Sequence, residues 1–234
     1  MKVLAGSHGY AQEKSPLPAD VVKLINALAS ENAAPPAPVG IKPPRGYERK
    51  KQKAVYRAVS KLKALGPPAY KVLIENWGDE RFSLTYSVDI NGPSKTKATV
   101  GEMCRRILFD QIQPYGYWPL QEERPDPDPD PDPLLRQDND PVDPRNRPTR
   151  PDYPRQFLTD QDTASQWLEE HKHKSLFEIQ LMVIDWIIEQ ESASPNDFTD
   201  RERKHMQVMR DKLVKSNKPL APGNYHTDDY GYYR

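Results

Sequence analysis

Residues 124–133 read RPDPDPDPDP, and no regular secondary structure can continue through this run. Each proline fixes φ near about −65° and lacks a backbone N–H donor, and each aspartate is pushed toward extended geometry by the proline that follows it. The aspartates also repel one another. We therefore expect a stiff, solvated polyproline-like spacer that rises about 3.1 Å per residue. The sequences on its two sides are interpreted as separate folding pieces.

Composition limits the size of the folded part and the class of partner. Hydrophobic residues make up 36% of the 234 residues, and the shortfall lies in proline-rich segments that cannot form a core. The chain has 34 Lys and Arg against 34 Asp and Glu, so it lacks the overall positive charge of a typical nucleic-acid-binding protein. No run of 18 apolar residues occurs, and we expect no transmembrane helix.

Hydrophobic periodicity predicts a mainly α fold built from two small helical modules. The N-terminal helical module spans 18–121, and the C-terminal three-helix module spans 157–216. A Pro/Asp-rich linker covers 122–156. Residues 1–17 form an N-terminal segment, and residues 217–234 form a flexible tail.

The first module is predicted to contain helices and one insertion. The predicted helices span 18–31, 47–65, 68–77 and 99–113. Apolar residues alternate with polar ones from Phe82 to Ile90, and Asn91-Gly92 follows, which predicts a β-hairpin within an insertion at 82–98. An ordered extended loop is the alternative. Thr99 and Glu102 have the spacing of a capping box at the start of the last helix.

Capping signals also delimit the three helices of the second module. Thr159 or Asp160 opens the first, and Ser175 with Glu178 opens the second. Thr199-Asp-Arg-Glu202 predicts the start of the third. The residues expected to face inward in this last helix are Met206, Met209, Leu213 and Val214.

The first twelve residues, MKVLAGSHGYAQ, bear on localisation. Gly9-Tyr10-Ala11 resembles the small-x-small end of a signal peptide, but the apolar stretch before it is too short to act as one. Either the start lies inside a longer gene, or the resemblance is a coincidence and the protein is cytoplasmic. Of the two, we expect export to the periplasm or beyond.

Nothing in the sequence indicates catalysis, a metal site or a cofactor. His171 and His173 are two residues apart and so point to different sides of a helix, beside two lysines that repel a cation. The single cysteine, Cys104, excludes a disulfide framework and falls on an apolar stripe, which predicts a buried, inert thiol. We expect a non-enzymatic protein, with an enzyme whose site is assembled from distant positions as the remote alternative.

Two groups of residues are candidates for binding. The first comprises aromatic residues of the hairpin and of the segment after the last helix of the first module, namely Tyr86, Tyr115, Tyr117 and Trp118. The second lies in the basic stretch 45–63, on one predicted helix, and comprises Arg49, Lys50, Lys53, Arg57 and Lys61. This stretch could contact phosphates or another anionic surface, or be a solvated outer face.

Residues 54–113 resemble a helix-turn-helix unit of the HEAT-repeat type. The sequence AVSKLKALGPPAYKVLIENWGDERF is similar to a first helix that ends in Leu-Gly, a proline-led second helix and an Asp/Arg turn at Asp79 and Arg81. VGEMCRRIL resembles the opening of a next repeat, and residues 82–98 interrupt the pattern. Together with SLFEIQLMVIDWIIEQE, this unit is similar to exported bacterial proteins of unknown activity. The resemblance implies binding rather than catalysis.

These observations predict a protein-protein interaction or scaffold protein, whose partner is another protein. The alternative is a protein that binds nucleic acid or an anionic surface through the basic helix at 45–63.

Overall fold

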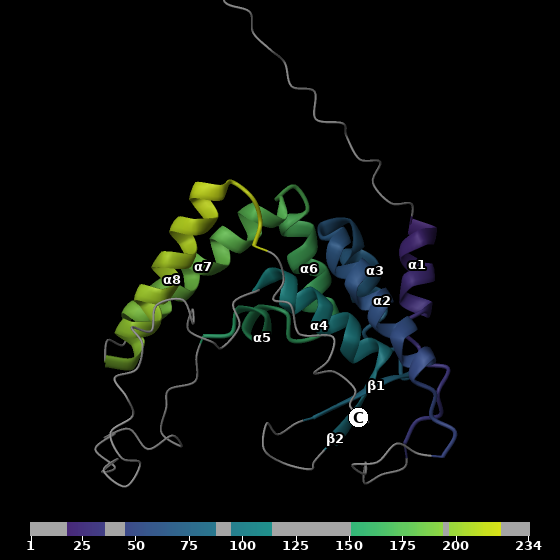
Figure 1. Cartoon of the computed structure of the whole chain (residues 1–234). Helices are drawn as coiled ribbons and strands as arrows, with labels where there is room; N and C mark the ends of the chain where they lie inside the picture. Colours follow the sequence, from purple (N-terminus) through teal and green to yellow (C-terminus); the bar gives the residue numbers. More distant parts are fainter. Residues whose placement is uncertain (1–17, 36–44, 88–94, 114–150, 194–196, 221–234) are drawn as a thin grey trace, which may run out of the picture. The chain divides into compact units, whose positions relative to one another are not determined.

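The computed structural model describes residues 18–35, 45–87, 95–113, 151–193 and 197–220 (Figure 1). Within these ranges the chain is mainly helical, as predicted, with eight α-helices, a short 3-10 helix and one two-stranded sheet. The described residues divide into two compact units, one ending at Cys104 and the other beginning at Arg105. The RPDPDPDPDP run lies outside the described residues.

The first unit contains three helices, a hairpin and the start of a fourth helix (Figure 1). In chain order these are α1 (Pro18–Asn26), α2 (Arg49–Leu65), η1 (Pro67–Ala69), α3 (Tyr70–Glu75), β1 (Phe82–Ser87), β2 (Lys95–Thr99) and α4 (Val100–Ile112). Helix α1 is shorter than predicted, since Glu31 lies beyond its end. The single predicted helix at 68–77 is η1 followed by α3. Helix α2 ends at Leu65, and Gly66 follows it with a φ of 65°, which suits a residue without a side chain.

The predicted β-hairpin is confirmed, because β1 and β2 pair in an antiparallel ladder. Leu84 lies opposite Ala98, and both are buried. The alternating pattern predicts that the polar side chains of β1 face solvent, yet Ser83 and Thr85 are also buried. Helix α2 contacts β1, and the Gln52 Nε2 donates to the Ser83 carbonyl at 3.5 Å. The strand is therefore covered on both faces.

Apolar stripes of the helices supply the core of the first unit. Its buried residues include Val21, Ile25 and Leu28 from α1, Val55, Ala58 and Leu62 from α2, and Tyr70, Leu73 and Ile74 from α3. Val100, Met103 and Cys104, at the start of α4, are also buried, which confirms the buried position predicted for Cys104.

The second unit continues α4 and contains four further helices (Figure 1). These are α5 (Tyr153–Phe157), α6 (Gln161–His171), α7 (Leu176–Ala193) and α8 (Asp197–Ser216). Helix α5 lies mostly in the segment 122–156, which was predicted as linker because of its high proline content. Helix α8 begins at Asp197, so Thr199 lies inside it rather than at its N-cap. Val214 of α8 is 48% exposed, contrary to the inward position predicted for it.

Two of the predicted helix starts in this unit are confirmed by their hydrogen bonds. The Asp160 carboxylate accepts from the Thr163 N–H at 2.8 Å, and the Asp160 N–H donates to the Thr163 hydroxyl at 3.1 Å. At the start of α7, the Glu178 carboxylate accepts from the Ser175 N–H at 2.7 Å. Each box satisfies backbone donors that an open helix end would leave unpaired.

A ring cluster and a buried amide join the helices of the second unit. Tyr153 of α5 lies edge-on to Trp186 of α7 at 5.3 Å and accepts a hydrogen bond from the Trp167 Nε1 at 3.2 Å. The buried Gln180 side chain donates to the Gln111 and Leu220 carbonyls at 2.8 and 3.1 Å, and accepts from the Leu220 N–H at 2.7 Å. The start of the segment predicted as flexible tail, up to Leu220, is thus bonded to α7.

Candidate functional site

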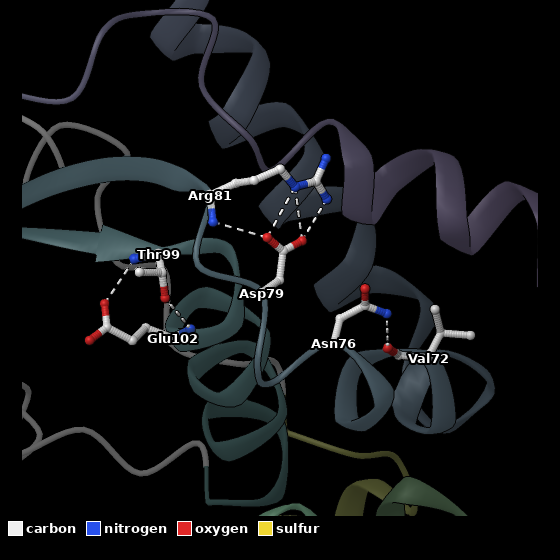
Figure 2. A network of polar contacts seen from close by, with 6 residues as sticks. All are labelled: Val72, Asn76, Asp79, Arg81, Thr99 and Glu102. Atoms are coloured by element: carbon white, nitrogen blue, oxygen red, sulfur yellow. Dashed lines mark hydrogen bonds and ion pairs between the residues drawn. The ribbon is translucent and has the colours of Figure 1, made fainter.

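The turn between α3 and β1 carries a dense polar network in the first unit (Figure 2). The Asp79 carboxylate accepts hydrogen bonds from the Arg81 backbone N–H, Nε and Nη2 at 2.6–3.0 Å, and this contact lowers its pKa. Beside it, Thr99 and Glu102 form the predicted capping box of α4. The Asp79 and Arg81 carbonyls accept from the Gly101 and Val100 N–H groups at 2.9 and 2.8 Å. The network therefore consists of satisfied structural contacts.

Cys104 and the two histidines of the HKHK run, His171 and His173, have different surroundings. Cys104 is buried, and burial raises the pKa of its thiol to about 12, so the thiolate nucleophile is scarce at neutral pH. His171 stacks on Trp167 and its Nδ1 lies 2.8 Å from the Trp167 carbonyl, while His173 is exposed. In the described ranges, no three His, Cys, Asp or Glu side chains gather as metal ligands would. None of the described helices has both the length and the hydropathy that crossing a membrane requires.

The two predicted groups of binding residues have different outcomes. Tyr115, Tyr117 and Trp118 lie outside the described residues, and of Tyr86 only the backbone, within β1, is described. The predicted aromatic surface therefore stays a prediction. By contrast, all five predicted anion-binding residues, Arg49, Lys50, Lys53, Arg57 and Lys61, lie on α2 and are exposed.

Helix α2 is held in place by its opposite face and its N-terminal end. Val55, Ala58 and Leu62 pack into the core of the first unit. The side chain of Asn32, which is 6% exposed, forms two hydrogen bonds with the backbone of Glu48, the residue before the helix. Its Nδ2 donates to the Glu48 carbonyl at 3.0 Å, and its Oδ1 accepts from the Glu48 N–H at 2.8 Å. Sequence reasoning missed Asn32, because its partner lies sixteen residues further along the chain.

Four of the five cations form a regular row, which we call the α2 cationic row: Arg49, Lys53, Arg57 and Lys61. Residues four apart turn by about 40° around a helix and rise by about 6 Å, so the row covers about a third of the circumference and about 18 Å of length. Lys50 falls within the same arc. Within the described residues, none of these five side chains has an ion-pair partner.

The side chains between the cations are small. Ala54, Ser60 and Ala64 are exposed on the same side of α2. They leave the helix backbone open to close approach by an extended ligand between the long cationic side chains. No residue between Arg49 and Lys61 in this arc is aromatic, and the half-buried Tyr56 lies about 20° beyond its edge.

The basic residues of α2 destabilise the helix that carries them. The first turn of α2 contains no acidic residue, and Arg49, Lys50 and Lys51 place positive charge at the positive end of the helix dipole. Lys51 is paired with Glu48 at 2.6 Å, which raises its pKa. The three like-charge pairs at spacing four along the row cost about 0.2–0.5 kcal/mol each. The row thus destabilises the helix by about 1 kcal/mol without any compensating contact in the described part of the chain.

Comparison with sequence models of protein families, with curated proteins and with solved structures finds no match for this chain. The likeness to a HEAT-type repeat therefore stays a prediction, as does export, whose signal at residues 1–12 lies outside the described residues.

Proposed function

We propose that this protein is a non-enzymatic binding protein that holds an acidic partner protein against the α2 cationic row. The observation that carries the proposal is the alignment of four exposed cations at spacing four on a helix whose other face is packed in a core. The destabilising charge pattern supports it, because a purely structural surface would be more stable with carboxylates interspersed.

One observation favours an acidic protein over nucleic acid. Within the arc from Arg49 to Lys61 no residue is aromatic, and the half-buried Tyr56 lies about 20° beyond its edge, so the arc itself has no platform for base stacking. A protein segment with carboxylates can pair with the cations of the row without any stacking contact.

The expected affinity follows from the number of pairs. Four exposed ion pairs at about 0.2–1 kcal/mol each supply at most about 4 kcal/mol, so the Kd at physiological salt is expected to be no tighter than about 1 mM. At about 0.01 M salt the Debye length is about 30 Å instead of about 8 Å, and binding becomes correspondingly tighter. The interaction is therefore expected to be weak, fast and sensitive to salt.

The test uses the full chain and poly-L-aspartate at about 0.01 M salt, followed by NMR of the backbone amides. We expect shifts on α2 that disappear at about 0.15 M salt, and their loss in the double variant Lys53→Glu/Arg57→Glu. The matched control is Lys204→Glu/Lys212→Glu on α8, two exposed lysines whose replacement makes the same change in net charge. Circular dichroism verifies that both variants are folded.

Three results would refute the proposal. Shifts that avoid α2 would show that the acidic ligand binds elsewhere on the protein. Equal loss of binding in the two double variants would show that only net charge matters. Tighter binding of duplex DNA than of poly-L-aspartate at the same salt would replace the acidic protein with nucleic acid as the partner.

A further inference from the structure

The two ends of the segment 114–150 are tied to a single side chain in the second unit. Gln113, which follows α4, bonds to the chain on the far side of this segment. Its Nε2 donates to the Pro151 carbonyl at 3.3 Å, and its Oε1 accepts from the Tyr153 N–H at 3.0 Å. The chain therefore leaves the end of α4 and returns to the same place, so the segment between is tethered at both of its ends to one point.

This segment carries the charge that complements α2. Residues 122–143 contain nine Asp and Glu and two Arg, which gives a net charge of −7. The stretch 45–63, which includes most of α2, contains eight Lys and Arg and one Glu, which gives +7. Since the whole chain has zero net charge, the residues outside these two stretches also sum to zero. Equal and opposite charges thus lie on one helix and one tethered segment of the same molecule, and they attract each other.

We propose that carboxylates of residues 122–143 occupy the α2 cationic row of the same molecule, and that the acidic partner protein binds the row by displacing them. This inference rests on the proposed function, because it names the regulation of the same surface. In the described ranges no member of the row has an ion-pair partner, so its cations are open to these carboxylates. Nine carboxylates are available for four long cationic side chains, so the contact requires no particular backbone conformation of the segment.

The tether at Gln113 is long enough for the segment to reach the row. Asp126 is 13 residues from Gln113, and an extended chain of that length spans up to about 45 Å. Helix α4 has 13 residues and is about 20 Å long. Its first turn belongs to the unit that carries α2, where the Val100 N–H donates to the Arg81 carbonyl at 2.8 Å. The tether can therefore span more than twice the length of the helix that leads back to this unit.

Tethering compensates for the weakness of the individual ion pairs. The Kd of four exposed pairs is no tighter than about 1 mM at physiological salt. A ligand tied to the same molecule by a short linker has an effective concentration on the order of millimolar. When this concentration equals the Kd, the ligand occupies the row in half of the molecules and lowers the apparent affinity for a competitor about twofold. At about 0.01 M salt the pairs are stronger and the occupied fraction is higher.

The test removes charge from the segment in the full chain. The four aspartates at 126, 128, 130 and 132 are changed to asparagine, which reduces the net charge of residues 122–143 from −7 to −3. The matched control makes the same change in net charge by replacing four exposed carboxylates on α6, α7 and α8: Asp162→Asn, Glu170→Gln, Glu189→Gln and Asp211→Asn. The backbone amides are followed by NMR at about 0.01 M salt, first without ligand and then with poly-L-aspartate. We expect the asparagine variant alone to shift the amides of α2 without ligand, and to bind poly-L-aspartate about twofold more tightly than the control.

The outcomes separate this inference from the proposed function. Shifts on α2 that occur in the asparagine variant, are absent from the control and persist on dilution of the protein support an intramolecular contact. Identical α2 signals and equal affinity for poly-L-aspartate in the two variants overturn this contact and leave the proposed function standing. Shifts that disappear on dilution also overturn it, because the segment of a second copy then occupies the row. Absence of poly-L-aspartate binding at α2 in both variants overturns the proposed function, and this inference with it.

Discussion

Gly101, in the first turn of α4, lies against the backbone of Trp77, and its replacement by alanine tests the packing of the first unit. A Cβ at this position would lie 2.1 Å from the Trp77 carbonyl oxygen and 2.7 Å from the carbonyl carbon. Real Cβ atoms essentially never approach heavy atoms closer than 3.0 Å. Because both obstacles are backbone atoms, no side-chain rotation can relieve the clash.

The magnitude follows from the movement that the clash requires. The start of α4 must retreat by about 0.9 Å, the difference between 3.0 and 2.1 Å, which strains the bonds from Gly101 N–H to Asp79 O and from Val100 N–H to Arg81 O, now 2.9 and 2.8 Å. Overpacking costs about 1–3 kcal/mol, and each weakened bond about 0.5–1.5 kcal/mol. The higher helix propensity of alanine offsets about 1 kcal/mol of this destabilisation. We expect Gly101→Ala to lower the free energy of unfolding by about 1–5 kcal/mol.

Urea denaturation followed by far-ultraviolet circular dichroism measures this difference. Gly78→Ala is the matched control, because a Cβ there meets nothing within 4 Å and its φ is not positive. The control is expected to leave stability unchanged or to raise it by up to about 1 kcal/mol through the unfolded state. A Gly101→Ala variant as stable as the wild type, with an unchanged dependence on urea, would refute the close packing of α4 on the Trp77 turn.

Three further predictions concern buried and paired polar groups. The hydroxyl of Tyr70, which is fully buried, has no hydrogen-bond partner among the described residues. The Tyr70→Phe variant is therefore expected to keep or raise the midpoint of thermal unfolding. A decrease of more than about 1 kcal/mol in the free energy of unfolding would reveal an unseen partner. Arg81 lowers the pKa of Asp79 below its ordinary value of 3.8, so this pair stabilises the fold above that pH, and the stabilisation is lost as the pH falls through the lowered folded-state pKa. The Asp79→Asn variant should therefore be less stable than the wild type at neutral pH and equal to it in strong acid. Urea titrations at several pH values would show this difference. The Gln180→Leu variant removes both hydrogen bonds to the Leu220 backbone and the one to the Gln111 carbonyl. It is expected to lower the free energy of unfolding by about 2–4 kcal/mol and to speed amide hydrogen exchange at Leu220. Unchanged exchange at Leu220 would contradict this contact.

Local signals in the sequence were sufficient for much of the helix pattern. The boxes at Thr99, Asp160 and Ser175 work within one helical turn, so the residues that form them can be found by spacing alone. The same holds for the α2 cationic row, whose members share a face because of the helical repeat. The hairpin at β1 and β2 was also predictable, from alternation and a turn signal.

Where local signals conflicted or were weak, the predictions failed. Helix α5 begins Asp-Tyr-Pro, and proline suits a first helical turn, but the proline-rich surroundings of this segment indicated linker. At Thr199 the box pattern is present in the sequence, yet α8 begins two residues earlier, at Asp197. Val214 has the spacing of an inward residue, and its exposure shows that periodicity overestimates the width of the buried face of α8.

The sequence by itself determined which stretches are helical, where several of them start, and that α2 carries an uninterrupted row of cations, because all of these depend on residues within a few positions of one another. Only the tertiary structure decided that Asn32 anchors the start of α2, and that the row is left exposed and without ion-pair partners among the described residues. Such facts depend on contacts between residues far apart in the chain, and no spacing rule encodes them. A solvated charged face and a binding surface have the same sequence, and they differ in what the fold places against them.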